Sequence, residues 1–239
     1  MEGDTIMISP NFISTKRNID IVFCIDGTGS MAPCIESVKR SAKRFYADFA
    51  RAMTESNSEI DSLRVKLIVF RDYKCDGQDS MVESSFFELP ADENQFAAYL
   101  DGIHAFGGCN EDANGLEALY RAMKSDFATG SKDRQVIVLF ADTTAIPLGS
   151  RGNYAGYPRD MVNDKGLLET WMCTQSHPSK LRERNKRLVM FAPKGSCYED
   201  IKQRYNRSIF TPVQIHGGLD EISFGDIIKI IAASASAVS

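Results

Sequence analysis

Residues 21–31 read IVFCIDGTGSM, an apolar run that passes into a loop of small polar residues. Five consecutive apolar side chains are typical of a strand buried on both faces in the middle of a parallel sheet. The Asp-Gly-Thr-Gly-Ser sequence ends this strand, and a helical pattern begins beyond Pro33. The loop is therefore predicted at the carboxyl end of a central strand, which is where open α/β sheets bind their ligands.

Oxygen-bearing side chains alternate along this loop at Asp26, Thr28 and Ser30. This spacing lets them converge on one point, and Mg²⁺ prefers an oxygen shell of this kind. The same residues also suit an ordinary strand-to-helix turn, in which Asp and Ser cap the helix and glycine adopts a positive φ. Taken alone, the loop supports a metal site and a capped turn about equally.

The whole chain has the composition of one globular domain. It has 239 residues, of which 43% are hydrophobic and 25% are charged, and this length is enough to bury a full core. A net charge of -4 gives no electrostatic reason to expect nucleic acid or an anionic membrane as a partner. No segment has the length of a transmembrane helix, and the N-terminus lacks the apolar core of an export signal.

Six cysteines, at positions 24, 34, 75, 109, 173 and 197, show no spacing typical of a zinc site. Without an export signal, we expect all six to be reduced thiols in a cytoplasmic protein.

Strand-like and helix-like segments alternate through the chain. Apolar or alternating patterns predict strands over 63–70, 82–89, 135–142, 187–192 and 209–215, and helices over 34–54, 92–103, 113–123, 161–175, 198–205 and 224–233. This spacing predicts an α/β fold of the Rossmann-like, doubly wound kind, with a mostly parallel central sheet and helices on both faces. We divide the chain into an N-terminal lead-in (1–18), a single domain (19–233) and a frayed tail (234–239).

Three other segments remain to be interpreted, and for two of them the sequence allows two interpretations. Asp72 follows a predicted strand, so it lies either near the first polar loop or in a surface pair with an arginine. The loop 149–159 is expected at the same end of the sheet, as a partner surface or a mobile connection. The basic stretch 180–186 is expected to be a solvated connection.

Two further acidic loops accompany the first. The sequence GGCNED at 107–112 forms a tight loop that places Glu111 and Asp112 in the first turn of the next helix, where acids complement the helix dipole. Asp142 ends the most apolar predicted strand. Two aspartates that end core strands, with an acidic Gly-Gly loop between them, form a more specific pattern than any single loop.

Together the three loops resemble the metal-ion-dependent adhesion site of the von Willebrand factor type A (VWA) domain. The family's first loop reads Asp-x-Ser/Thr-x-Ser, matched here by Asp26, Thr28 and Ser30, and DGTGSM is similar to the form common in intracellular VWA proteins. The Gly-Gly pair at 107–108 matches the second loop, and Asp142 matches the third. The resemblance covers residues 19–233 in architecture, whereas its specific motifs lie only in these loops.

The second loop departs from the family pattern. VWA domains carry a threonine ligand where this chain has Glu111 or Asp112. A carboxylate there adds negative charge, which would tighten cation binding or fill the position normally left for a partner's acid. The resemblance implies a site for Mg²⁺, or for Mn²⁺ or Ca²⁺, formed by Asp26, Thr28, Ser30, Glu111, Asp112 and Asp142.

The function implied by the resemblance is protein binding, in which a partner's acidic side chain replaces a water on the metal. Family analogy suggests a kinase, phosphatase or ATPase as the protein partner. Two alternatives stay open: a scaffold whose degenerate site binds partners without metal, and a metal-assisted hydrolase. The hydrolase has little support, because the histidines at 104, 177 and 216 are isolated and no P-loop or nucleophile elbow is present. We therefore assign no catalytic residue.

Overall fold

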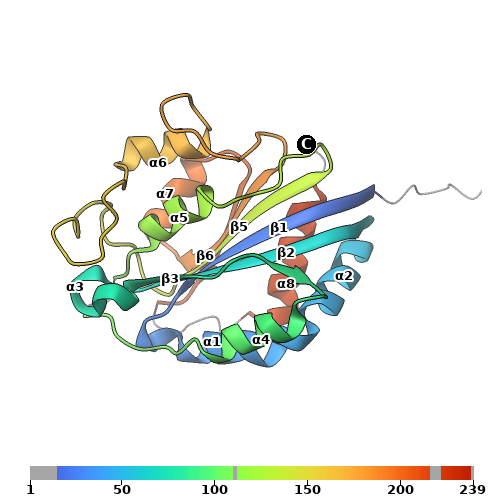
Figure 1. Cartoon of the computed structure of the whole chain (residues 1–239), viewed down its shortest axis with the longest axis horizontal. Helices are drawn as coiled ribbons and strands as arrows, with labels where there is room; N and C mark the ends of the chain where they lie inside the picture. The colour runs from blue at the N-terminus through green and yellow to red at the C-terminus, as the bar shows by residue number, and fades with distance from the viewer. Residues whose placement is uncertain (1–14, 110–111, 216–221, 238–239) are drawn as a thin grey trace, which may run out of the picture.

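The computed structural model describes residues 15–109, 112–215 and 222–237. A seven-stranded sheet runs through the middle of the molecule (Figure 1). Its five parallel strands lie in the order β2 (Ser58–Phe70), β1 (Thr15–Asp26), β5 (Asp133–Phe140), β6 (Lys186–Pro193) and β7 (Ser208–Val213). Two short antiparallel strands, β3 (Met81–Glu83) and β4 (Phe87–Leu89), pair with β2. The mostly parallel sheet expected from the sequence is confirmed.

Helices cover both faces of the sheet (Figure 1). One face carries α1 (Ala32–Ser41), α2 (Phe45–Glu55), α4 (Glu93–Asp101) and α8 (Phe224–Ser236). The other carries α5 (Gly115–Met123), α6 (Asp164–Trp171) and α7 (Cys197–Arg204). A one-turn helix, α3 (Tyr73–Asp76), and three 3₁₀ turns (Gly29–Met31, Ala42–Arg44 and Gly77–Ser80) belong to the connections.

The alternation of side chains along the strands explains these two layers. On β1, Ile21 and Phe23 pack in the core beneath α8, while Val22 and Cys24 pack in the core beneath α5. All eight residues of β5 are buried, as expected for a strand covered on both faces. The central strands are therefore held rigidly, and the loops at their carboxyl ends start from fixed points.

The predicted strand over 82–89 is wrong in one respect, because the structure has two short strands there. Residues 84–86 separate them. The backbone N–H of Ser84 donates to the Leu67 carbonyl and its hydroxyl accepts from the Leu67 N–H, both at 2.9 Å. The side chain thus takes the place of a backbone partner and interrupts the ladder.

Other boundaries also move. The helix expected over 34–54 is divided by the 3₁₀ turn Ala42–Arg44, and the helix expected over 161–175 shortens to α6. β1 begins at Thr15 and α8 ends at Ser236, so both elements run beyond the 19–233 range taken from the sequence.

The basic stretch 180–186 is not wholly solvated. Lys186, the first residue of β6, is 1% exposed. Its ammonium group donates to the Trp171 carbonyl at 2.9 Å and pairs with Glu183 at 2.7 Å. A strand start can bury a charged side chain when a carbonyl and a carboxylate receive it.

The expectation that all six cysteines are reduced is wrong for two of them. Cys75 in α3 and Cys109 after the Gly-Gly pair form a disulfide across 34 residues of sequence, with their Cα atoms 5.7 Å apart. The loops that carry them meet because both lie at the carboxyl end of the sheet. Disulfides persist mainly in oxidising compartments, so the cysteines do not support the predicted cytoplasmic location. None of the described helices has both the length and the hydrophobicity needed to cross a bilayer.

Candidate metal centre

The first polar loop places two hydroxyls against a buried carboxylate. Asp26, the last residue of β1, is fully buried. Its Oδ1 accepts hydrogen bonds from the backbone N–H of Thr28 at 2.9 Å and from the Thr28 hydroxyl at 2.7 Å. The hydroxyl oxygens of Thr28 and Ser30 are 3.4 Å apart. The first three predicted ligands are therefore close together, and Oδ2 of Asp26 is buried with no hydrogen-bond partner among the described residues.

Asp142 brings a second carboxylate without a partner. It follows β5 by two residues and is fully buried, and neither of its carboxylate oxygens has a hydrogen-bond partner in the described part of the chain. Burial raises the pKa of Asp26 to about 7, and the negative charge of Asp142 adds to this rise, while the hydrogen bonds from Thr28 and the charge of Arg71 oppose it. Because β1 and β5 are neighbouring parallel strands, Asp26 and Asp142 lie at the same end of the sheet.

The second loop approaches the third. The Ala113 carbonyl accepts from the backbone N–H of Ile146 at 2.9 Å, and Ala113 forms a parallel bridge with Ala145. Asp112, directly before this bridge, is half-buried, and its charge adds to the effect of burial in raising the pKa of Cys197. Asp112 thus lies at the end of the sheet where Asp142 lies. The prediction that it stands in the first turn of the next helix is wrong, because α5 begins only at Gly115. Glu111 lies outside the described residues, so the choice between these two acids stays a prediction.

Arg71 connects the loops, a role that the sequence did not reveal. Its buried guanidinium donates to three backbone carbonyls, those of Gly27 (3.0 Å), Asp79 (2.7 Å) and His104 (2.8 Å). It also stacks 3.9 Å from the ring centroid of Phe106. A Cβ at Gly27 would lie 2.6 Å from Cγ1 of Val69 and 2.9 Å from the Arg71 guanidinium carbon, so glycine is needed for this close approach. Arg71 therefore positions the first loop and places a positive charge near Asp26.

Asp72 forms an ion pair with an arginine, as one of the two predicted arrangements has it, but its carboxylate is buried rather than at the surface. Its carboxylate is fully buried and accepts two hydrogen bonds from the Arg151 guanidinium, at 2.7 and 3.0 Å. It also caps α3 by accepting from the backbone N–H of Lys74. The sulfur atoms of Cys75 and Cys109 lie beside it, but they are joined to each other as a disulfide and so are not thiolate ligands for a metal. Asp72 is thus a structural anchor for the loop 149–159.

A second buried acid holds the same loop. Glu117 on α5 is fully buried, and its Oε1 accepts from the Tyr157 hydroxyl at 2.9 Å and from the Gly149 N–H at 3.4 Å. Burial raises the pKa of Glu117. The tyrosine ring packs edge-on against Tyr73. Of the two alternatives for this loop, an ordered surface therefore fits better than a mobile connection.

A family model described as the von Willebrand factor type A domain matches residues 21–144, which include all three acidic loops. The chain belongs to this family. No curated protein matches it.

Solved structures agree with the fold of this VWA domain. The pilus adhesin SpaC from Lactobacillus rhamnosus GG is 13% identical with a TM-score of 0.51, and the alignment covers 92% of this chain and 31% of SpaC. A von Willebrand factor type A protein from Catenulispora acidiphila is 11% identical with a TM-score of 0.50, covering 92% of this chain and 43% of that one. The VWA domain thus spans less than half the length of these chains, and at such identities the likeness concerns the fold alone.

Proposed function

We propose that this VWA domain is a protein-interaction module that holds Mg²⁺ at Asp26 and Asp142 and uses it to bind an acidic side chain of a partner protein. One observation carries this proposal. Three carboxylate oxygens, Oδ2 of Asp26 and both oxygens of Asp142, are buried with no hydrogen-bond partner among the described residues. Buried carboxylates are expensive unless they are paired or coordinate a metal. A divalent cation would supply the missing positive charge.

The donor set suits a hard cation. Asp26 and Asp142 would supply carboxylate oxygens, and Thr28 and Ser30 would supply hydroxyl oxygens. Mg²⁺ fits best because it is octahedral and retains water at positions that the protein leaves open, although Mn²⁺ or Ca²⁺ would also accept this shell. One such water is the position at which a partner's carboxylate would bind.

The second loop determines how open the site is. Asp112 or Glu111 would bring a further negative charge close to the metal, where most VWA domains have a neutral threonine. If that carboxylate coordinates directly, it strengthens metal binding and competes with the partner's acid. We therefore expect Asp112→Ala or Glu111→Ala to weaken Mg²⁺ binding while improving partner access.

The kind of partner rests on family analogy, which suggests a kinase, phosphatase or ATPase. Neither nucleic acid nor a membrane is proposed as a partner, and no catalytic activity is proposed. We do propose a cytoplasmic location. In a reducing cytoplasm, the Cys75–Cys109 disulfide would open to two thiols.

Calorimetric titration of Mg²⁺ and Mn²⁺ into the purified domain tests the metal site. Binding should be lost in Asp26→Ala and retained in the control Asp101→Ala, which removes an exposed aspartate at the end of α4. Equal affinity of wild type and Asp26→Ala would contradict the assignment. An absence of binding in the wild type, repeated with a soluble acidic peptide present, would instead favour the degenerate scaffold.

A further inference from the structure

A row of buried arginines lies at the other end of the sheet. Arg17, Arg134 and Arg187 stand near the starts of β1, β5 and β6, which are neighbouring parallel strands. Each is two residues before a side chain that packs in the core beneath α8, so the alternation of the strands places all three on that face. They are 8%, 3% and 4% exposed, respectively. We call these three residues the arginine row.

Capping of α8 explains two members of the row. Arg134 donates through Nε to the Ala235 carbonyl at 3.0 Å, and Arg187 donates through Nε to the Ser234 carbonyl at 3.1 Å. Both guanidiniums also reach the Ala237 carbonyl, at 3.4 and 2.9 Å. Positive charge at a helix C-terminus is favourable, because the carbonyls there carry a partial negative charge. Two like charges that share one carbonyl oxygen nevertheless repel each other.

Arg17 has no such role. Its buried Nε has no hydrogen-bond partner among the described residues. No described carboxylate forms a salt bridge with any member of the row. Glu183, which pairs with Arg207 at 3.4 Å, offsets part of the positive charge near Arg187, while Arg207 itself adds positive charge beside Arg134 and Arg187. The negative end of a helix amounts to only about half a charge, so it cannot balance three guanidiniums.

The electrostatics agree with a missing counter-charge. Burial lowers the pKa of all three arginines. For Arg134 the fall reaches about 10, and the neighbouring Arg17, Arg187 and Arg207 contribute to it. An arginine near carboxylates shifts the other way: the hydrogen bonds from Arg64 to Asp20 raise the pKa of Arg64. The arginine row is therefore a cluster of buried positive charge, as expected of a site that binds an anion.

We infer that the arginine row binds an oxyanion, a phosphate or a carboxylate group, between Arg17 and the C-terminal end of α8. Guanidinium groups present a fork of N–H donors that matches the oxygens of phosphate and carboxylate. Arg17 supplies unused donors, and Arg134 and Arg187 supply charge from a fixed position. Arg207, whose side chain is 28% exposed, lies on the solvent side and would attract the anion.

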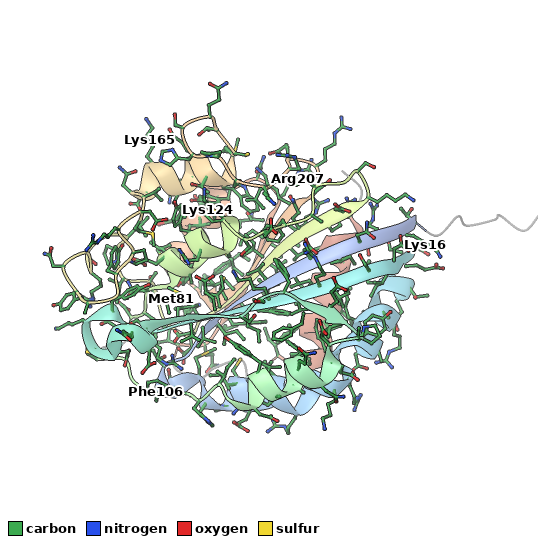
Figure 2. All side chains as sticks on the ribbon, in the orientation of Figure 1. Lys16, Met81, Phe106, Lys124, Lys165 and Arg207 are labelled. Carbon is green, nitrogen blue, oxygen red and sulfur yellow. A yellow bond between two sulfur atoms is a disulfide. The ribbon has the colours of Figure 1, made fainter. Side chains whose placement is uncertain are left out.

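This site is separate from the proposed metal centre. Arg17 and Asp26 lie nine residues apart on one strand, a distance of about 30 Å in extended chain. Figure 2 shows Lys16, next to Arg17, and Phe106, next to the metal loops, at opposite ends of the molecule. Loss of the metal site should therefore leave oxyanion binding intact, and the two proposals fail independently.

The test is calorimetric titration of the domain with inorganic phosphate and, separately, with acetate, in metal-free buffer at constant ionic strength set with sodium chloride. Saturable binding supports the inference, and the tighter of the two probes identifies the source as a phosphate or a carboxylate. Wild-type protein that binds neither probe would overturn it.

Matched variants locate the binding. Arg17→Gln should bind at least about tenfold more weakly, as expected when one charged hydrogen-bonding group is lost. The control Lys16→Gln, which removes an exposed charge from the adjacent position, and the metal-site variant Asp26→Ala should both bind like the wild type. If Arg17→Gln does not fold, Arg17→Lys keeps the charge without the fork and should also lose affinity. Equal affinity of the Arg17 and Lys16 variants would overturn the inference.

Discussion

The two ends of the sheet bury charge of opposite sign, and among the described residues neither cluster forms a salt bridge with a group of the other sign. At the carboxyl end, Oδ2 of Asp26 and both oxygens of Asp142 are buried with no donor in the described part of the chain. At the amino end, Nε of Arg17 is buried with no acceptor in that part, beside two further guanidiniums. Other buried acids are paired with a cation, as Asp72 is with Arg151, or accept hydrogen bonds from neutral groups, as Glu117 does from Tyr157. The contrast indicates that these two clusters are kept for ligands, since pairing was available to the same chain.

The largest effect is expected from the pH dependence at the carboxyl end. The carboxyl of Asp26 titrates near 7 when folded and near 3.8 when unfolded, so the folded protein binds more protons between these values. Metal-free wild type should therefore lose about 4 kcal/mol of stability as the pH rises from 4 to 8, and Asp26→Asn should remove this loss.

Urea denaturation in chelator at pH 4 and pH 8 measures this difference. Saturating Mg²⁺ should restore the stability of the wild type at pH 8 and leave Asp26→Asn unchanged. Parallel pH profiles for wild type and variant would show that Asp26 carries no uncompensated charge.

The disulfide should be the next largest contributor, because it connects two loops at the carboxyl end. The double variant Cys75→Ser/Cys109→Ser should lose about 3 to 4 kcal/mol of unfolding free energy, the chain-entropy value for a closed loop of this size. A dithiol reductant should lower the stability of the wild type similarly and leave the double variant unaffected. A stability loss in the double variant on adding reductant would point to another cause.

Arg71→Met tests the connection between the metal loops. It leaves three backbone carbonyls without their donor and removes the positive charge near Asp26, so we expect a loss of about 2 kcal/mol. Mg²⁺ affinity should change in the same variant, since the first loop loses its support. Arg40→Met, at an exposed position of α1, should change neither quantity.

The smallest effect is expected at the amino end. Arg17→Gln in oxyanion-free buffer should leave stability unchanged or raise it by up to about 1 kcal/mol, because an uncompensated buried charge is removed. Thermal unfolding against the Lys16→Gln control measures this. A loss above about 2 kcal/mol would mean that Arg17 is satisfied within the fold, and the comparison between the two ends would no longer hold.

The mostly parallel sheet, and the position of Asp26 and Asp142 after its central strands, could be predicted from the sequence, because hydrophobic runs with polar ends have few structural solutions. The role of Arg71 could not, since its partners are backbone carbonyls that any sequence provides. The pairing of Asp72 with Arg151 and the Cys75–Cys109 disulfide join residues distant in the chain.

The arginine row escaped prediction for a related reason. Basic residues at strand starts resemble solvated ends, and only the position of the last helix shows that they are buried. The opposite signs of the buried charge at the two ends of the sheet are therefore visible only in the tertiary structure and not in the local sequence pattern.

The most direct test of the metal centre is a titration of isotope-labelled protein with Mn²⁺, observed by the paramagnetic broadening of backbone amide signals in NMR. Amides of the three loops, such as those of Gly27, Ser30 and Thr143, should broaden first, and Mg²⁺ should reverse the effect by competition. Amides near Arg17 and Arg134 should remain sharp. Broadening centred elsewhere, or equal broadening in Asp26→Ala, would contradict a metal site at the carboxyl end of the sheet.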